Sequence, residues 1–158
     1  MANRMSDAAF PLARFFLAAI FVASGFGKIA DFSGTQGYMA SVGMPATALF
    51  LVGAILVEVL GGLALIVGYR ARLAAIALVG FLVPATLLFH AFWAAPPEAA
   101  QMQMISFMKN LALIGGLLFV AASGAGAYSL DAWRARRRIP ESVRLFGRVE
   151  AASARSRA

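Results

Sequence analysis

The apolar stretch at residues 50–69, FLVGAILVEVLGGLALIVGY, constrains the fold most, because it is long enough to cross a bilayer. Its one charged side chain, Glu58, lies near the middle. A carboxylate at that depth costs about 2.5–3.5 kcal/mol on insertion scales. On a helix, Gly61 and Gly62 share the face of Glu58, and small residues let another backbone come close. We therefore expect Glu58 to face protein rather than lipid.

The composition places the whole chain in a membrane. Of 158 residues, 61% are hydrophobic and 13% are charged, and the mean hydropathy is +0.80. A soluble domain carries about 25% charged residues. The chain has no cysteine, which excludes disulfides, thiol redox chemistry and thiolate metal sites within it. These features predict an integral membrane protein of one compact domain.

Four apolar segments predict an all-α fold, a membrane four-helix bundle. The expected spans are residues 12–30, 46–69, 73–92 and 105–123. Long polar loops are expected at 31–45 and 93–103, because both contain Pro and small or polar residues. The first segment also has features of a cleaved signal peptide. Three further spans make a retained first helix the simpler interpretation, with the four-span domain covering residues 1–131.

The basic residues predict the orientation of the bundle. Arg4 and Arg14 precede or begin the first span, Arg70 and Arg72 separate the second from the third, and eight arginines follow the fourth. No Lys or Arg occurs at 31–45 or 93–107. Cytoplasmic loops carry an excess of Lys and Arg, so both termini are expected in the cytoplasm.

The basic tail at residues 132–158 predicts contact with anionic lipid. A net charge of +7 would suggest nucleic acid in a soluble protein, but here the charge is concentrated beside a membrane segment. We therefore expect no nucleic acid partner. Within the tail, residues 140–150 fit a short amphipathic helix lying in the headgroup plane. A disordered basic tail is the alternative.

The remaining polar residues of the spans are expected near the outer face, with Glu58 deeper. They are Lys28, His90, Lys109 and Asn110. In one interpretation the lysines extend to the interface and Glu58 is a structural partner for one of them. In a second, the residues line an outward-facing polar pocket for a small molecule, since intramembrane charge marks functional sites. A proton or solute path is the third. A single histidine and few acidic residues favour neither a bis-histidine haem nor a metal site.

Several of these motifs carry a family resemblance. SGFGK at residues 24–28 follows Arg14, and Glu58 is followed by Gly61-Gly62, Gly68 and Arg72. With Phe89-His90, Lys109-Asn110 and GAGAYSLD at 124–131, their order and spacing resemble the DoxX family of small four-helix membrane proteins over about residues 12–131. The resemblance implies a four-span fold in the bacterial inner membrane.

The resemblance also implies redox chemistry, because the family is named for membrane subunits resembling those of archaeal thiosulfate:quinone oxidoreductase. The leading hypothesis is a membrane subunit of a quinone-linked redox system with a soluble redox partner. Lys28, His90, Lys109 and Asn110 would bind a quinone headgroup, and Glu58 is the candidate proton relay. The alternatives are a non-catalytic scaffold that recruits a soluble partner, and a small-solute or proton transporter, which four spans favour only in an oligomer. Without cysteine, sulfur chemistry by this chain alone is not expected.

Overall fold

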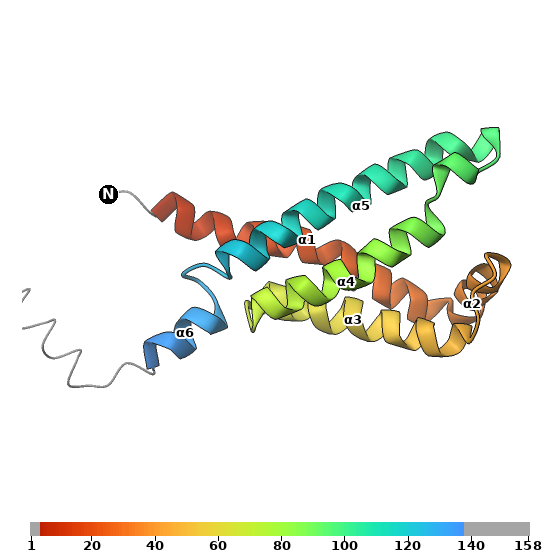
Figure 1. The fold of residues 1–158 in the computed structure, drawn as a ribbon. Coiled ribbons are helices and arrows are strands. Elements are labelled where there is room, and N and C mark those ends of the chain that lie inside the picture. Colours follow the sequence, from red (N-terminus) through yellow and green to blue (C-terminus); the bar gives the residue numbers. More distant parts are fainter. Residues whose placement is uncertain (1–3, 138–158) are drawn as a thin grey trace, which may run out of the picture.

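The fold consists of helices throughout residues 4–137, the part of the chain that the computed structural model describes (Figure 1). Four helices are long and apolar enough to cross a membrane, which confirms the predicted all-α architecture. The elements in chain order are α1 (Arg4–Ala30), α2 (Phe32–Ser41), α3 (Thr47–Val67), α4 (Ala71–Phe89), the 3-10 turn η1 (Phe92–Ala94), α5 (Pro97–Ser123) and α6 (Leu130–Arg137).

The spanning helices pack in the order α1, α3, α4, α5, and α1 makes far fewer contacts with α5 than with α3. Glycine allows the closest of these contacts. A Cβ added at Gly62 of α3 would lie 2.7 Å from Val22 Cγ2 and 3.3 Å from the Ala18 carbonyl oxygen of α1. Small residues at such a crossing let two helix backbones pack closely where no hydrophobic effect drives association. This contact fixes the register between α1 and α3, and with it the height of Glu58.

The apolar core occupies one half of the bundle. Leu65, Leu78 and Leu117 are fully buried, and Ala18 and Phe21 of α1 belong to the same cluster. Most of these residues lie toward the end of the bundle that carries the start of α1, the α3–α4 turn and α6, here called the terminal end (Figure 1). The opposite end carries α2 and η1, and is called the α2 end. Toward the α2 end, α5 diverges from α3 (Figure 1).

Two segments predicted to be loops are partly helical. Residues 32–41 form α2, because Asp31 caps the helix by accepting a hydrogen bond from the Gly34 backbone N–H at 3.1 Å, and because Met39 is buried. Helix α5 begins at Pro97, within the expected loop at 93–103, since proline is favoured in the first helical turn. Pro97 therefore starts a long helix, and the glycines of residues 32–41 are tolerated in a short one.

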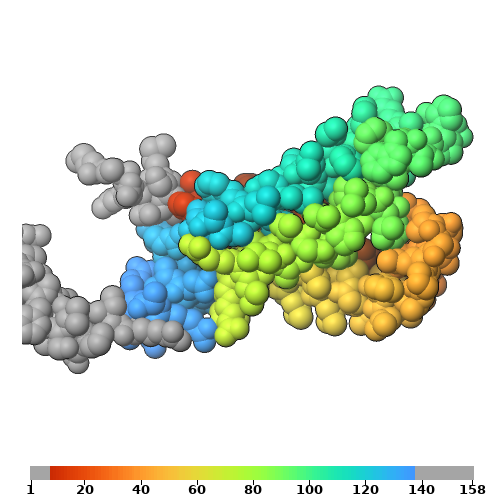
Figure 2. Space-filling view, viewed as in Figure 1, coloured from red at the N-terminus to blue at the C-terminus, as the bar shows by residue number. Residues whose placement is uncertain are grey.

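Helix α2 covers the corner of the bundle beside the end of α4 (Figure 2). The Tyr38 and Phe89 rings lie 5.6 Å apart, and the Tyr38 hydroxyl donates to the Phe89 carbonyl at 3.4 Å. Phe92, Trp93 and Phe107 form a second aromatic group at the same end, with ring centroids 5.1–5.8 Å apart. Such aromatic groups are typical of the membrane interface.

The orientation of the bundle in the membrane is testable with reporter fusions. An even number of crossings puts both termini on one side, and the arginine distribution predicts that this side is cytoplasmic. We expect fusions near Gly37 and Pro97 to report an external location, and fusions near Arg70 and at the C-terminus a cytoplasmic one. A cytoplasmic signal from the fusion at Gly37 would contradict the orientation. The amphipathic helix expected at residues 140–150 lies outside the described residues.

Candidate functional site

An ion pair between Lys28 of α1 and Glu58 of α3 forms the centre of the candidate site. The Lys28 Nζ lies 2.9 Å from Glu58 Oε2 and donates a hydrogen bond to Oε1 at 3.0 Å. It also donates to the Ser24 Oγ, one helical turn back, at 2.6 Å. The Glu58 side chain is 5% exposed and that of Lys28 24%. The structure therefore brings together two of the predicted site residues, and Glu58 faces protein as its helical face predicts.

Glycine also positions this ion pair. Gly25 of α1 lies against α3, where a Cβ would come 2.5 Å from Val59 Cγ2 and 3.5 Å from Glu58 Cβ. A larger residue at Gly25 would push the helices apart at the height of the pair. The SGFGK motif at residues 24–28 thus supplies the hydroxyl, the close approach and the ammonium of the site from one face of α1.

A second buried polar group joins α4 to α5. Asn110 Nδ2 donates to Thr86 Oγ1 at 3.0 Å, and Thr86 Oγ1 donates to the Leu82 carbonyl at 2.6 Å. Asn110 and Thr86 are both buried. Buried polar groups cost free energy unless they are hydrogen-bonded, and each of these has a partner. The Asn110 side chain therefore links α5 to α4 by a buried hydrogen bond.

The two other predicted site residues lie apart from the ion pair. At the α2 end, His90 Nδ1 lies 2.9 Å from Gln103 Oε1, which is within hydrogen-bonding distance. Lys109 is on the exposed side of α5 and has no hydrogen bond or ion pair with the residues of the described range. A lysine at such a position extends its ammonium to the interface. The five predicted residues therefore lie in four separate places, and only Lys28 and Glu58 contact each other.

A third polar group at the terminal end was not among the predicted site residues. Arg14 of α1 is 2% exposed; its Nη1 donates to the Ala125 carbonyl, and its Nη2 donates to the Tyr128 carbonyl at 2.8 Å. Asp131 accepts from the Arg70 and Ala71 backbone N–H groups at 2.7 and 3.0 Å. These contacts, called the terminal clasp, fix the segment after α5 to α1 and to the first turn of α4. The sequence feature that could have indicated the terminal clasp is Arg14, an arginine inside an apolar span.

The sequence comparisons decide the family. The DoxX family model matches residues 9–91 of the 158. The chain belongs to the DoxX family. It is 38% identical to the inner membrane protein YqjF of Escherichia coli over 129 residues, covering 82% of this chain and 94% of that protein. It is 33% identical to inner membrane protein YphA of the same organism over 120 residues, covering 76% and 86%. No solved structure matches the chain.

Membership of the DoxX family agrees with the four spanning helices and places the chain in the inner membrane as a multi-pass protein. The family match contains Lys28, Glu58 and His90, whereas Lys109 and Asn110 lie beyond it. Within residues 4–137 there is no group of three His, Cys, Asp or Glu side chains that could hold a metal ion. Between residues of the described range, the ion pair inside the bundle is Lys28–Glu58.

Proposed function

We propose that this DoxX-family protein is the membrane subunit of a quinone-linked redox system. The observation that carries the proposal is the Lys28–Glu58 ion pair, with Ser24 beside it, inside the span region of the bundle. Intramembrane charges are rare, face the bundle interior and mark pathways for ligands, ions or protons. The pair lies between α1 and α3 on the α2 side of the apolar core.

The chemistry of quinone reduction matches the groups of this site. Converting a quinone headgroup to a quinol takes two electrons and two protons. The Lys28 ammonium and the Ser24 hydroxyl are hydrogen-bond donors for a headgroup carbonyl, and Glu58 is the group that would pass protons toward it. The electrons would come from a soluble redox partner. Lys109, His90 and Asn110 have other positions or partners, so the proposed site uses the α1–α3 group alone.

Purification of the protein with its bound lipids tests this function. We expect a quinone to co-purify at close to one molecule per chain, and Lys28→Met to lower its occupancy about tenfold, since a hydrogen bond from a charged donor is lost. Lys109→Met is the matched control, because it removes the same charge from an exposed position. Absence of quinone from the purified protein, or equal loss in both variants, would contradict the proposal.

A second candidate function is a non-catalytic scaffold. It is favoured by the geometry of the ion pair, because the Lys28 ammonium already contacts both carboxylate oxygens of Glu58 without a ligand. It is also favoured by α6, whose Arg134 and Arg137 are exposed and stack on Tyr69 and Trp133 at 5.0 and 3.9 Å. The same purification separates the two candidates, since a stoichiometric soluble partner without quinone would favour the scaffold.

A further inference from the structure

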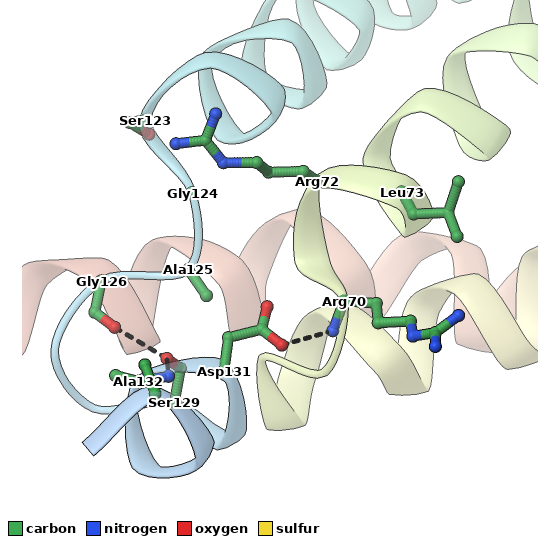
Figure 3. A pocket seen from close by; sticks show the side chains of 11 residues that line it. Arg70, Arg72, Leu73, Ser123, Gly124, Ala125, Gly126, Ser129, Asp131 and Ala132 are labelled. Atoms are coloured by element: carbon green, nitrogen blue, oxygen red, sulfur yellow. Dashed lines mark hydrogen bonds between the residues drawn. The ribbon is translucent and has the colours of Figure 1, made fainter. Parts of the chain in front are cut away.

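A pocket at the terminal end lies between the α3–α4 turn and the connection from α5 to α6 (Figure 3). Its volume is about 470 Å³, within the usual range for small-molecule sites. Two arginines, Arg70 and Arg72, come from the turn side. The other wall is built from small residues of the connection. The two arginine side chains leave the turn in opposite directions, and it is Arg72 that reaches toward this wall (Figure 3). The lining includes Ser123, Gly124, Ala125, Gly126, Ser129 and Asp131.

The Asp131 carboxylate also lines this pocket, and it offsets part but not all of the charge of the two arginines. Its two carboxylate oxygens accept the backbone N–H groups of Arg70 and Ala71, and so cap the first turn of α4. Neither the Arg70 nor the Arg72 guanidinium forms an ion pair with a residue in the described range. With two arginines and one aspartate in its lining, the pocket keeps a net positive charge, and the Arg72 guanidinium supplies donors to it.

Arg72 extends across the pocket toward the end of α5 (Figure 3). Its Nε and Nη2 lie 3.3 and 3.5 Å from the place that a Cβ would occupy on Gly124, so a glycine there leaves room for the guanidinium. Gly124 also has φ +85°, which strains any residue with a side chain. Gly124, in the connection from α5 to α6, therefore leaves space for the Arg72 guanidinium at the pocket wall.

The surroundings place the pocket at a membrane interface. Leu73 and Ile76, which follow the turn on α4, are each 58% exposed in a span-forming helix. Tyr69 and Trp133 lie nearby on the turn and on α6, as interfacial aromatics do. The Arg134 side chain, followed by the Arg70 charge, holds the pKa of the Tyr69 phenol below its usual value. Arg70, Arg72 and Arg134 thus concentrate positive charge at this end.

We propose that this pocket binds the phosphate of an anionic phospholipid headgroup. Arg72, which extends across the pocket, donates to the phosphate oxygens, and Arg70 adds positive charge from the turn. The acyl chains lie along the exposed Leu73 and Ile76. Basic pockets between spanning helices on the cytoplasmic side bind anionic headgroups in this way. The site is separate from the basic tail, and it does not depend on the redox function. A free phosphate has the same chemistry as the headgroup, so the test has to distinguish the two sources.

The test is lipid binding to the full-length protein in neutral detergent, titrated with phosphatidylglycerol and followed by native mass spectrometry. We expect Arg72→Gln to weaken binding about tenfold through the loss of charged hydrogen bonds. Arg70→Gln, whose side chain does not pack on α5, should weaken it in the same direction. Arg137→Gln is the matched control, since it removes the same charge from α6 outside the pocket. We expect Arg72→Lys to recover part of the binding.

Three results would overturn the proposal. Equal weakening by Arg72→Gln, Arg70→Gln and Arg137→Gln would mean that diffuse charge, not the pocket, holds the lipid. Displacement of phosphatidylglycerol by millimolar inorganic phosphate would assign the pocket to a free phosphate instead of a lipid. A lower thermal stability of Arg72→Gln without lipid, together with unchanged binding in Arg70→Gln, would reduce Arg72 to a helix-packing residue and also contradict the proposal.

Discussion

Replacing Glu58 with glutamine is expected to lower the free energy of unfolding by about 3–5 kcal/mol, because it leaves the Lys28 ammonium partly buried without its counter-charge. Lys28→Met should cost a similar amount, since the Glu58 carboxylate would then lie buried and unpaired. The measurement is equilibrium unfolding in mixed micelles. Lys109→Met is the control, and its change should stay within about 0.5 kcal/mol because surface substitutions are mild.

The double variant of Lys28→Met with Glu58→Gln isolates the interaction between the two side chains. We expect the pair of changes to cost less than the sum of the two single changes, because no lone charge remains. Additive costs would rule out the ion pair as a stabilising contact. Unchanged stability in Glu58→Gln alone, combined with lost activity, would instead identify Glu58 as a proton relay that holds little of the fold together.

Much of this ion pair is predictable from the sequence. A carboxylate in the middle of an apolar span, with Gly61 and Gly62 on its face, predicts that Glu58 faces the bundle, and the structure agrees. Which lysine it contacts is not predictable from the same residues. That choice depends on the register of α1 against α3, which is set by close contacts at Gly25 and Gly62. Such contacts involve backbone positions far apart in the sequence.

The parts that sequence reasoning missed share a physical cause. Thr86 is an ordinary residue of an apolar helix until Asn110 donates to it from α5, and α2 is a polar stretch until Asp31 caps it. Hydrogen-bond partners of this kind follow from tertiary packing, not from local periodicity. Arg14 shows the same limit, because as a positive charge near a span end it indicates orientation, and its burial becomes visible only when the segment after α5 covers it.

Removing the Arg14 side chain is expected to have the second large effect. Arg14→Met deletes the donors to the Ala125 and Tyr128 carbonyls, and hydrogen bonds from charged groups contribute about 1.5–3 kcal/mol each. Part of that loss is offset, because methionine avoids the cost of burying a guanidinium. We expect a net loss of about 2–4 kcal/mol, together with faster proteolysis between Gly124 and Asp131, the segment that Arg14 holds.

Two further variants separate the geometry of the terminal clasp from its charge. Arg14→Lys keeps the charge but lacks the planar fork that reaches two carbonyls, so it should recover less than half of the loss. Arg134→Met removes an exposed arginine at the same end of the bundle and should leave stability nearly unchanged. Full recovery by lysine would show that charge alone is required at this position. Equal losses in Arg14→Met and Arg134→Met would show that the clasp contacts contribute nothing beyond net charge.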